Sequence, residues 1–296
     1  MAGNGVTISN VTINCPGTSA GTFTCNNCNI GMSSGIALTS GDINAIAGPN
    51  SQSGAGVDNL APGNAQLTSL VGGLFASTYD ACVLEFDLQV LSDSVEFKYS
   101  FGSEEYLEWV SAGYNDVFAF YISGPGIAGQ QNIALVPGTA TPVSIDNVND
   151  VTNSAYYIDN GDGFTAPQNA SNYYIQYDGF TTVLTAKRKN LQPCQTYHLR
   201  LAIADAGDGI LDSGVFLEAN SLTSNGVTVD DASTNDPNTS NAMEGCVNGK
   251  IVFRIDNPVP TPVTVTYQIG GTATNGLDYQ NIPNTITIPA GIPQQL

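Results

Sequence analysis

The sequence predicts an all-β protein, in which a large jelly-roll-like β-sandwich is followed by part of a smaller, Ig-like β-sandwich. Three observations predict this class. Apolar and polar residues alternate over several short segments, as they do in strands whose successive side chains point to opposite faces of a sheet. The 32 glycines and 15 prolines separate these segments, as turns do between strands. Only residues 65–74 suggest a helical period.

The strand pattern is clearest in the middle of the chain. Residues 116–122 are apolar at nearly every position, which is typical of a central strand buried on both faces. Residues 48–63 form a long polar loop, of a kind that is often functional. The basic cluster 187–189 is predicted to be a solvated turn. The predicted strands of the large domain are residues 7–13, 34–42, 84–90, 95–101, 116–122, 197–203 and 215–219.

A change of composition marks a domain boundary near residue 225. Residues 221–245 are rich in Asp, Asn, Ser and Thr, so we assign residues 1–225 to the large domain and residues 226–296 to a second one. Alternating segments follow at 251–255, 263–269 and 286–288, which is typical of a small sandwich. These strands are too few to close a sandwich, so we expect the N-terminal part of a larger repeat.

The charge is strongly acidic, with 26 Asp and Glu against 7 Lys and Arg and a formal net charge of −19. Nucleic acid is excluded as a partner, because phosphate binding needs clustered cationic side chains. An acidic surface suits high salt, bound divalent cations or simple solubility. No apolar run is long enough to span a membrane. No signal peptide is visible after Met1, so we expect a cytosolic chain or a mature, exported one.

Six cysteines favour export, because an even number suggests disulfides formed in an oxidising compartment. The closely spaced pair Cys25 and Cys28 also suggests zinc or redox chemistry, but the chain's only histidine, His198, is distant and no βαβ pattern is present. We therefore predict at least one disulfide within residues 15–28. The cysteines are Cys15, Cys25, Cys28, Cys82, Cys194 and Cys246.

Six segments of the large domain carry a more specific pattern. They are Phe101–Glu108, Tyr114–Gly126, Asn132–Thr139, Tyr177–Thr181, Ala202–Asp208 and Asp212–Leu217. In this order they resemble the choice-of-anchor L domain, and the resemblance covers residues 1–222. Such domains occur in secreted bacterial proteins, many of them from Bacteroidetes, whose C-terminal anchoring modules vary. The resemblance implies export and surface display, and it supplies no activity.

The second domain carries a shorter pattern. Gly271–Ala273, Gly276–Tyr279 and Ile286–Gly291 together resemble the Calx-β repeat. This resemblance implies an Ig-like sandwich of a kind that is frequent in adhesins and sometimes binds calcium. The acidic segment expected after the Pro289-Ala290-Gly291 turn is missing here, so the resemblance does not carry a calcium site over to this repeat.

We predict a Ca²⁺ site in the large domain, at the Gly-rich loop 205–212. Calcium prefers six to eight oxygen ligands on flexible backbone. This loop and the segments 104–108 and 115–116 all leave the ends of predicted core strands, where a sandwich brings loops together. The alternative is a set of separate turns, since Asp and Gly commonly build turns. The candidate ligands are Asp205, Asp208, Asp212, Glu104, Glu105, Asn115 and Asp116.

The function predicted from these features is a non-catalytic, adhesin-like or structural module of a bacterial surface protein, extracellular and stabilised by Ca²⁺. Surface glycans, or neighbouring copies or domains of the same protein, are the expected partners. The first alternative is a carbohydrate-binding module that stacks sugars on exposed aromatic side chains. Its candidates are Trp109, Tyr156, Tyr157, Tyr173 and Tyr174.

The second alternative is a glycoside hydrolase with a carboxylate pair from Glu104, Glu105 and Glu108. Neighbouring strand residues point to opposite faces, so Glu104 and Glu105 could cooperate only if a turn intervened. A Ser-His-Asp hydrolase would need His198, which lies within a predicted strand, and the chain has no G-x-S-x-G element. We therefore predict that the protein is not an enzyme.

Overall fold

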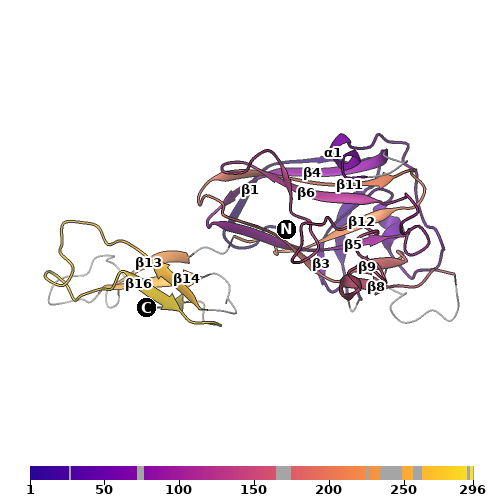
Figure 1. The fold of residues 1–296 in the computed structure, drawn as a ribbon. Helices are drawn as coiled ribbons and strands as arrows, with labels where there is room; N and C mark the ends of the chain where they lie inside the picture. The colour runs from indigo at the N-terminus through magenta and orange to yellow at the C-terminus, as the bar shows by residue number, and fades with distance from the viewer. Residues whose placement is uncertain are drawn as a thin grey trace. The chain divides into compact units, whose positions relative to one another are not determined.

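A computed structural model shows an all-β protein built of antiparallel sheets (Figure 1). The chain divides into two compact units, Met1–Ser224 and Asn225–Leu296, and each is described by itself. The structure describes residues 1–26, 28–71, 77–164, 175–224, 227–233, 249–255, 262–291 and 294–295.

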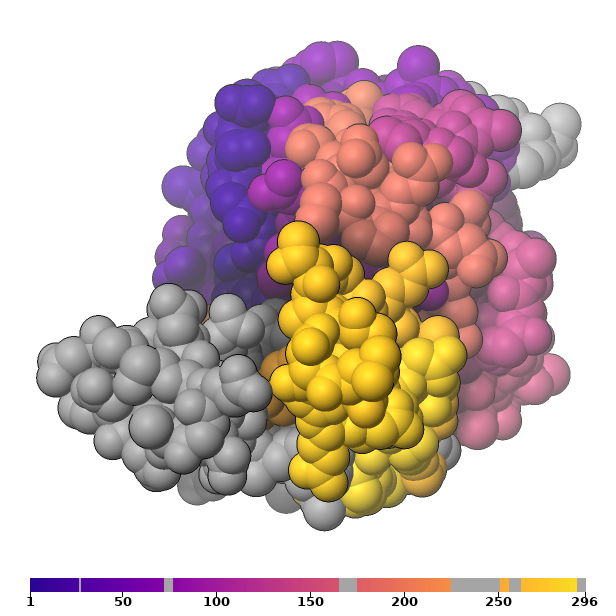
Figure 2. Space-filling model, turned by 90° about the vertical axis from the view of Figure 1, so that its left-hand side faces the viewer, coloured from indigo at the N-terminus to yellow at the C-terminus, as the bar shows by residue number. Residues whose placement is uncertain are grey.

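The first sheet of unit 1 carries the longest strands of the described chain. Its strands are β1 (Val6–Asn14), β4 (Thr78–Val90), β6 (Val117–Ser123), β7 (Gln131–Asn132) and β11 (Thr196–Ala206). They are arranged in the order β1-β4-β11-β6-β7. Figure 2 shows this order at one end of the sheet, where indigo, magenta, orange and pink segments follow one another. The predicted buried strand is confirmed, because Val117 to Ile122 of β6 are all buried.

The second sheet of unit 1 has the order β2-β3-β12-β5-β9-β8, and β10 pairs with β5 in addition. The prediction of a turn at residues 187–189 is wrong, because these residues end β10 and pair with residues 94–96 of β5. The strands are β2 (Ala20–Thr24), β3 (Ser34–Thr39), β5 (Ser94–Ser103), β8 (Tyr157–Asp159), β9 (Gly179–Thr181), β10 (Leu184–Lys189) and β12 (Ser213–Glu218).

The two sheets of unit 1 pack face to face through a layer of aromatic side chains. Phe97 of β5 lies 4.8 Å from Phe120 of β6, measured between ring centroids. Phe101 stacks on Phe118 at 5.1 Å with an angle of 19° between the rings. Alternate residues of each strand supply this layer, as the sequence pattern predicts for a sandwich. The predicted β-sandwich fold is therefore confirmed.

Helices are short in the described residues: α1 (Ala65–Thr68), η1 (Ile43–Ile46) and η2 (Ser154–Tyr156). The helical period predicted for residues 65–74 yields the single turn α1, whose first amides are capped by the Asn64 side chain. No helix of the described residues is long and apolar enough to span a membrane.

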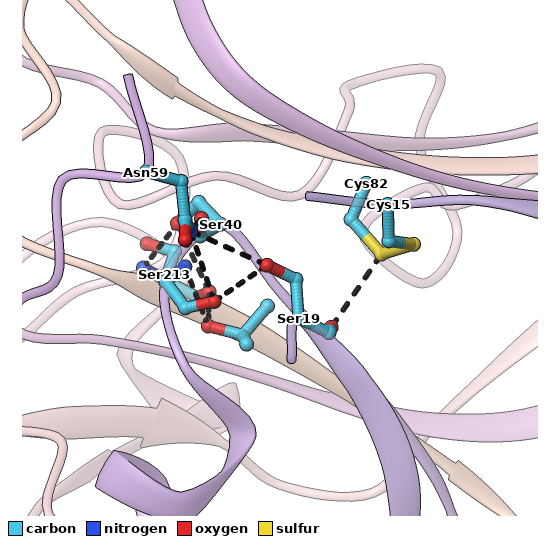
Figure 3. The surroundings of a disulfide bond; sticks show 8 residues. Cys15, Ser19, Ser40, Asn59, Cys82 and Ser213 are labelled. Carbon is cyan, nitrogen blue, oxygen red and sulfur yellow. Dashed lines mark hydrogen bonds between the residues drawn. A yellow bond between two sulfur atoms is a disulfide. The ribbon is translucent and has the colours of Figure 1, made fainter. Parts of the chain in front are cut away.

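Two disulfides fasten the N-terminal part of unit 1. Cys25 pairs with Cys28, as predicted for residues 15–28, and Cys15 pairs with Cys82 of β4 across 67 residues. The second bond lies beside a group of buried polar residues, including Ser19, Ser40 and Ser213 (Figure 3). Among the described cysteines, Cys194 is free and exposed. Cys246 lies outside the described residues.

The described residues of unit 2 form two small antiparallel sheets. One has the order β13 (Val227–Ser233), β14 (Gly249–Ile255) and β17 (Gln294–Gln295), and the other pairs β15 (Val263–Thr266) with β16 (Thr285–Ile288). The described core of unit 2 is much smaller than that of unit 1. The buried apolar side chains in its described cluster are Phe253, Ile255 and Ile288. The predicted strands at 251–255, 263–269 and 286–288 overlap β14, β15 and β16.

The sheet registers bring several strand termini to the same end of unit 1. In the first sheet, Ala206 at the end of β11 pairs with Thr78 at the start of β4, and Ala204 pairs with Val117 at the start of β6. In the second sheet, Ser103 at the end of β5 pairs with both Ser213 and Gly179. We call this the acidic end, because carboxylates gather on the segments that leave it.

Candidate functional site

Seven buried carboxylates lie on the strands and loops of the acidic end. Each sits within three residues of a point where one of the strands β4, β5, β6, β9, β11 or β12 begins or ends. Antiparallel register therefore brings together residues that are far apart in the sequence. The buried carboxylates are Asp80, Glu104, Glu105, Asp116, Asp178, Asp205 and Asp212.

Asp116, Asp205 and Asp212 form the innermost group, and we call them the deep trio. Each is at most 3% exposed. The Ala206 amide donates to Oδ1 of Asp116 at 2.8 Å, whereas Oδ2 of Asp116 and both carboxylate oxygens of Asp205 have no hydrogen-bond partner. The Val57 amide donates to both oxygens of Asp212, at 3.2 and 3.1 Å. Buried polar atoms are almost always hydrogen-bonded, so three unpartnered oxygens in one group are unusual.

The deep trio is electrostatically unfavourable in its charged form. Burial raises the pKa of Asp116 and of Asp212 to about 7, and it raises the pKa of Asp205 well above its ordinary value. The charge of Asp116, and then that of Asp212, raise the pKa of Asp205 further, although the nearby Ser40 hydroxyl opposes them. Carboxylates in this position must either bind protons or be compensated by a cation.

Glu105 and Asp208 lie beside Asp116. The Asp116 amide donates to Oε2 of Glu105 at 3.3 Å. Burial raises the pKa of Glu105 to about 11, and the charges of Asp116, Asp208 and Asp146 act in the same direction. Asp208 is only partly buried and accepts a hydrogen bond from the Ile210 amide at 3.2 Å. Asp208 therefore marks the outer side of the group.

Glu104 turns toward different partners. Burial, and then the charge of Asp178, raise its pKa to about 9, and neither of its oxygens has a hydrogen-bond partner. Burial raises the pKa of Asp178 to about 7, although the Asn50 side chain donates to its Oδ1 at 2.7 Å. Glu104 and Glu105 thus have different neighbours, although both lie in the turn that follows β5.

A narrow cavity lies beside Glu104 and Asp212. Its other lining residues are Asp42, Ala45, Ile46, Ala55, Gln176 and Tyr177. The cavity is too narrow to hold a water molecule as it stands.

The side-chain oxygen of Asn115 binds a backbone amide and not the carboxylate group. Its Oδ1 accepts a hydrogen bond from the Asp146 amide at 3.3 Å and so orders the segment behind Glu105. Of the seven predicted ligands, the structure thus brings Asp116, Asp205, Asp212, Glu105 and Asp208 into one electrostatic group. Glu104 and Asn115 have other partners.

The loop 48–63 covers the acidic end. Its backbone amides at Val57, Asn59 and Ala61 donate to the carboxylates of Asp212 and Asp80. Gly41 also allows a close approach, because a Cβ at this position would overlap the carboxylate of Asp212. The sequence marks the loop as polar but does not show that its backbone binds carboxylates.

Cationic side chains of unit 1 pair with carboxylates outside this group. The lysines and arginines of unit 1 are Lys98, Lys187, Arg188, Lys189 and Arg200. Among the described residues, the ion pairs join these cations or His198 to Glu85, Asp87, Glu96 and Glu218, and none reaches a buried carboxylate. Within the same residues, no three His, Cys, Asp or Glu side chains are grouped closely enough to hold a metal ion as they stand.

The sequence analysis missed two carboxylates of this end, Asp80 and Asp178. Asp178 lies in a segment that resembles the choice-of-anchor pattern and directly precedes β9. Its position next to a strand end, which the other buried carboxylates share, could have identified it. Asp80 lies within β4 at a positive φ of 50°, and no pattern in the sequence distinguishes it.

Comparison with known proteins adds one assignment. Residues 1–223 match the Choice-of-anchor L domain family. No curated protein and no solved structure matches the chain. The family suggests a surface-associated module of a secreted protein, and it is not known to be enzymatic.

Proposed function

Because the chain belongs to the Choice-of-anchor L domain family, we propose that it is a non-catalytic, adhesin-like module displayed outside the cell and stabilised by Ca²⁺. The observation that carries the calcium part is the deep trio. Asp116, Asp205 and Asp212 are buried together, three of their oxygens lack a hydrogen-bond partner, and no described ion pair compensates them. A divalent cation bound among them would compensate the charge that burial leaves uncompensated.

Calcium fits this position better than other common ions. The available donors are carboxylate, hydroxyl and carbonyl oxygens, and calcium accepts such ligands in irregular geometry. Small shifts of the deep trio toward one another would accompany binding, since the side chains do not surround an ion as they stand. Glu105 could supply a further ligand, because it contacts the backbone amide of Asp116. Asp208 lies close enough for its charge to act on Glu105. Glu104 approaches Asp212 across the small cavity, and Asn115 positions the segment behind Glu105.

Three further observations support a structural role. The carboxylates lie beneath the loop 48–63, and Glu104 and Glu105 have different neighbours. This arrangement differs from that of a glycoside hydrolase, in which two carboxyl groups face each other across a sugar-binding cleft. The disulfides Cys15–Cys82 and Cys25–Cys28 favour an oxidising, extracellular location. For unit 2 we retain the Calx-β proposal, which its small antiparallel sheets support.

Removal of calcium tests the proposal. We expect excess EGTA to lower the melting temperature by several degrees, because an ion at a hundredfold excess over its Kd stabilises the native state by about 2.7 kcal/mol. Magnesium should replace calcium poorly. Asp205→Asn should remove the calcium response, whereas Asp93→Asn, an equal change of charge at an exposed site, should keep it. An unchanged melting curve in EGTA, with no calcium bound by elemental analysis, would refute the calcium site.

A further inference from the structure

An open pocket lies on the outer side of the acidic end. Its volume is about 280 Å³. It combines an aromatic wall with two carboxyl groups, and neither Asp205 nor Asp212 lines it. It is therefore distinct from the deep trio. The lining residues are Ser53, Glu105, Trp109, Tyr114, Asp208, Ile210 and Leu211.

Trp109 and Tyr114 form the aromatic wall. Their ring centroids are 5.1 Å apart and the ring planes meet at 75°, an edge-to-face arrangement that aromatic pairs favour. Trp109 is 41% exposed, so much of its surface is accessible to a ligand. Gly207, at a φ of +97°, allows the loop after β11 to approach this wall, because a Cβ there would lie 2.8 Å from the Tyr114 ring.

Glu105 and Asp208 are the two carboxyl groups of the pocket. Glu105 is 2% exposed and lines the pocket. Its carboxyl group accepts a hydrogen bond from the Asp116 amide at 3.3 Å. Burial and the charges of Asp116, Asp208 and Asp146 disfavour the ionised form of Glu105, so Glu105 serves as a hydrogen-bond acceptor and Asp208 supplies the charge of the pocket. The sequence contains no lysine or arginine between residues 99 and 186, or between residues 201 and 249. The chain itself therefore supplies no cation from the segments that form the pocket.

We propose that this pocket binds the cationic head group of a lysine or arginine side chain of a protein partner. An ammonium or guanidinium group over the faces of Trp and Tyr gains cation–π attraction, and the same group offsets the charge of Asp208 and can donate a hydrogen bond to Glu105. A neutral sugar could stack on Trp109 but would leave that charge uncompensated. The pocket is also slightly smaller than the sites of about 300–1,000 Å³ that hold drug-sized molecules, which favours a single side chain over an oligosaccharide.

The pocket identifies a type of partner for the proposed surface module, and it shares Glu105 and Asp208 with the surroundings of the proposed calcium site. The calcium proposal concerns the deep trio and predicts a change of stability. The pocket proposal concerns the outer carboxyls and predicts a change of ligand binding. Each binding measurement is therefore made both in calcium and in EGTA.

Trp109 is the only tryptophan of the chain, so its fluorescence reports on the pocket directly. The probes are Nα-acetyl-arginine methylamide and its uncharged analogue, Nα-acetyl-citrulline methylamide, which has nearly the same shape. We expect a saturable change with the arginine compound and at least fivefold weaker binding of the citrulline compound. High salt should weaken binding of the arginine compound.

A matched pair of variants locates the effect. Asp208→Asn should weaken arginine binding at least fivefold, whereas Asp93→Asn, an exposed position elsewhere, should change it less than twofold. Asp208 is partly exposed, and an unchanged far-UV circular dichroism spectrum of its variant confirms that the protein is folded. The proposal is overturned if citrulline binds equally well, if both variants weaken binding alike, or if only saccharides bind. It is also overturned if Ca²⁺ competes with the arginine compound for the pocket, which would make the pocket a metal site.

Discussion

The partly exposed carboxylates of the two sheets and the buried carboxylates of the acidic end lie in opposite environments, although both belong to unit 1. Glu85, Asp87, Glu96 and Glu218 lie within strands, their side chains are 26–32% exposed, and each has a cationic or histidine partner. The carboxylates of the acidic end are nearly inaccessible, and most have raised pKa values.

This difference shows that position, rather than composition, decides what a carboxylate does. An exposed pair contributes about 0–1 kcal/mol, because water already solvates both charges. A buried, unpaired carboxylate lowers stability unless it is protonated or bound by a cation. The few cations of unit 1 pair with the exposed carboxylates, so the acidic end depends on protons or on ions from solution.

The largest expected difference between the two sets is in the pH dependence of stability. The pKa values of Asp116, Asp178 and Asp212 are near 7 in the folded chain, and the ordinary value is 3.8. Between these pH values the folded state binds more protons than the unfolded state, so stability falls as the pH rises. In EGTA, one such carboxyl accounts for about 4 kcal/mol lost between pH 4 and 7.

Urea unfolding in EGTA at several pH values would measure this effect. In calcium the fall should become smaller, because the ion replaces the protons and binds more tightly as the pH rises. Substitution of Glu85 by Gln, on the exposed surface, should leave the pH profile unchanged. A metal-free protein that becomes more stable from pH 5 to 8 would contradict the assignment of unpaired, buried carboxylates.

The second prediction concerns the disulfide that closes the segment carrying the loop 48–63. Cys15 and Cys82 are 67 residues apart, and a bond across a loop of this length stabilises by about 4 kcal/mol in the chain-entropy account. We expect the double substitution Cys15→Ser and Cys82→Ser to lower the free energy of unfolding by about that amount. Hydrogen exchange should increase first at Val57 and Asn59, whose amides bind the buried carboxylates.

The matched control is the double substitution Cys25→Ser and Cys28→Ser. This pair is separated by three residues and should contribute only roughly 1–2 kcal/mol, because it closes a much shorter loop. If both double variants lost the same stability, the long disulfide would have no special role at the acidic end.

The smallest expected effect concerns the exposed carboxylates themselves. Glu96→Gln removes the ion pair with Lys187, and we expect it to lower the free energy of unfolding by less than about 1 kcal/mol at any pH. Chemical unfolding of the variant beside the parent protein measures this difference. A loss above about 2 kcal/mol would remove the distinction between the two sets of carboxylates.

Much of the fold could be predicted from the sequence, because alternation is a local property of a strand. The long strands β4, β5, β6 and β11 have clear patterns, and the sequence locates them. The prediction failed at short or polar strands. In β10, three consecutive basic residues suggest a turn, but pairing with β5 overrides their polarity.

The candidate site could be predicted only in part. The sequence identified Asp205, Asp212 and Asp116 as acidic residues beside strand ends. It did not show that Glu104 would face Asp178, because that pairing depends on which strands are neighbours in the sheet. Tyr156 and Tyr157, two of the candidate sugar platforms, are only partly exposed, whereas Tyr173 and Tyr174 lie outside the described residues.

The sequence by itself determined the all-β class, the acidic charge and the family of unit 1. These properties depend on composition, on local periodicity and on short motifs. Only the tertiary structure decided which carboxylates meet. The Val57 amide binds Asp212 across 155 residues, and the Ala206 amide binds Asp116 across 90. Such contacts depend on sheet order and register, which one-dimensional patterns do not encode, and burial then sets the pKa of each group.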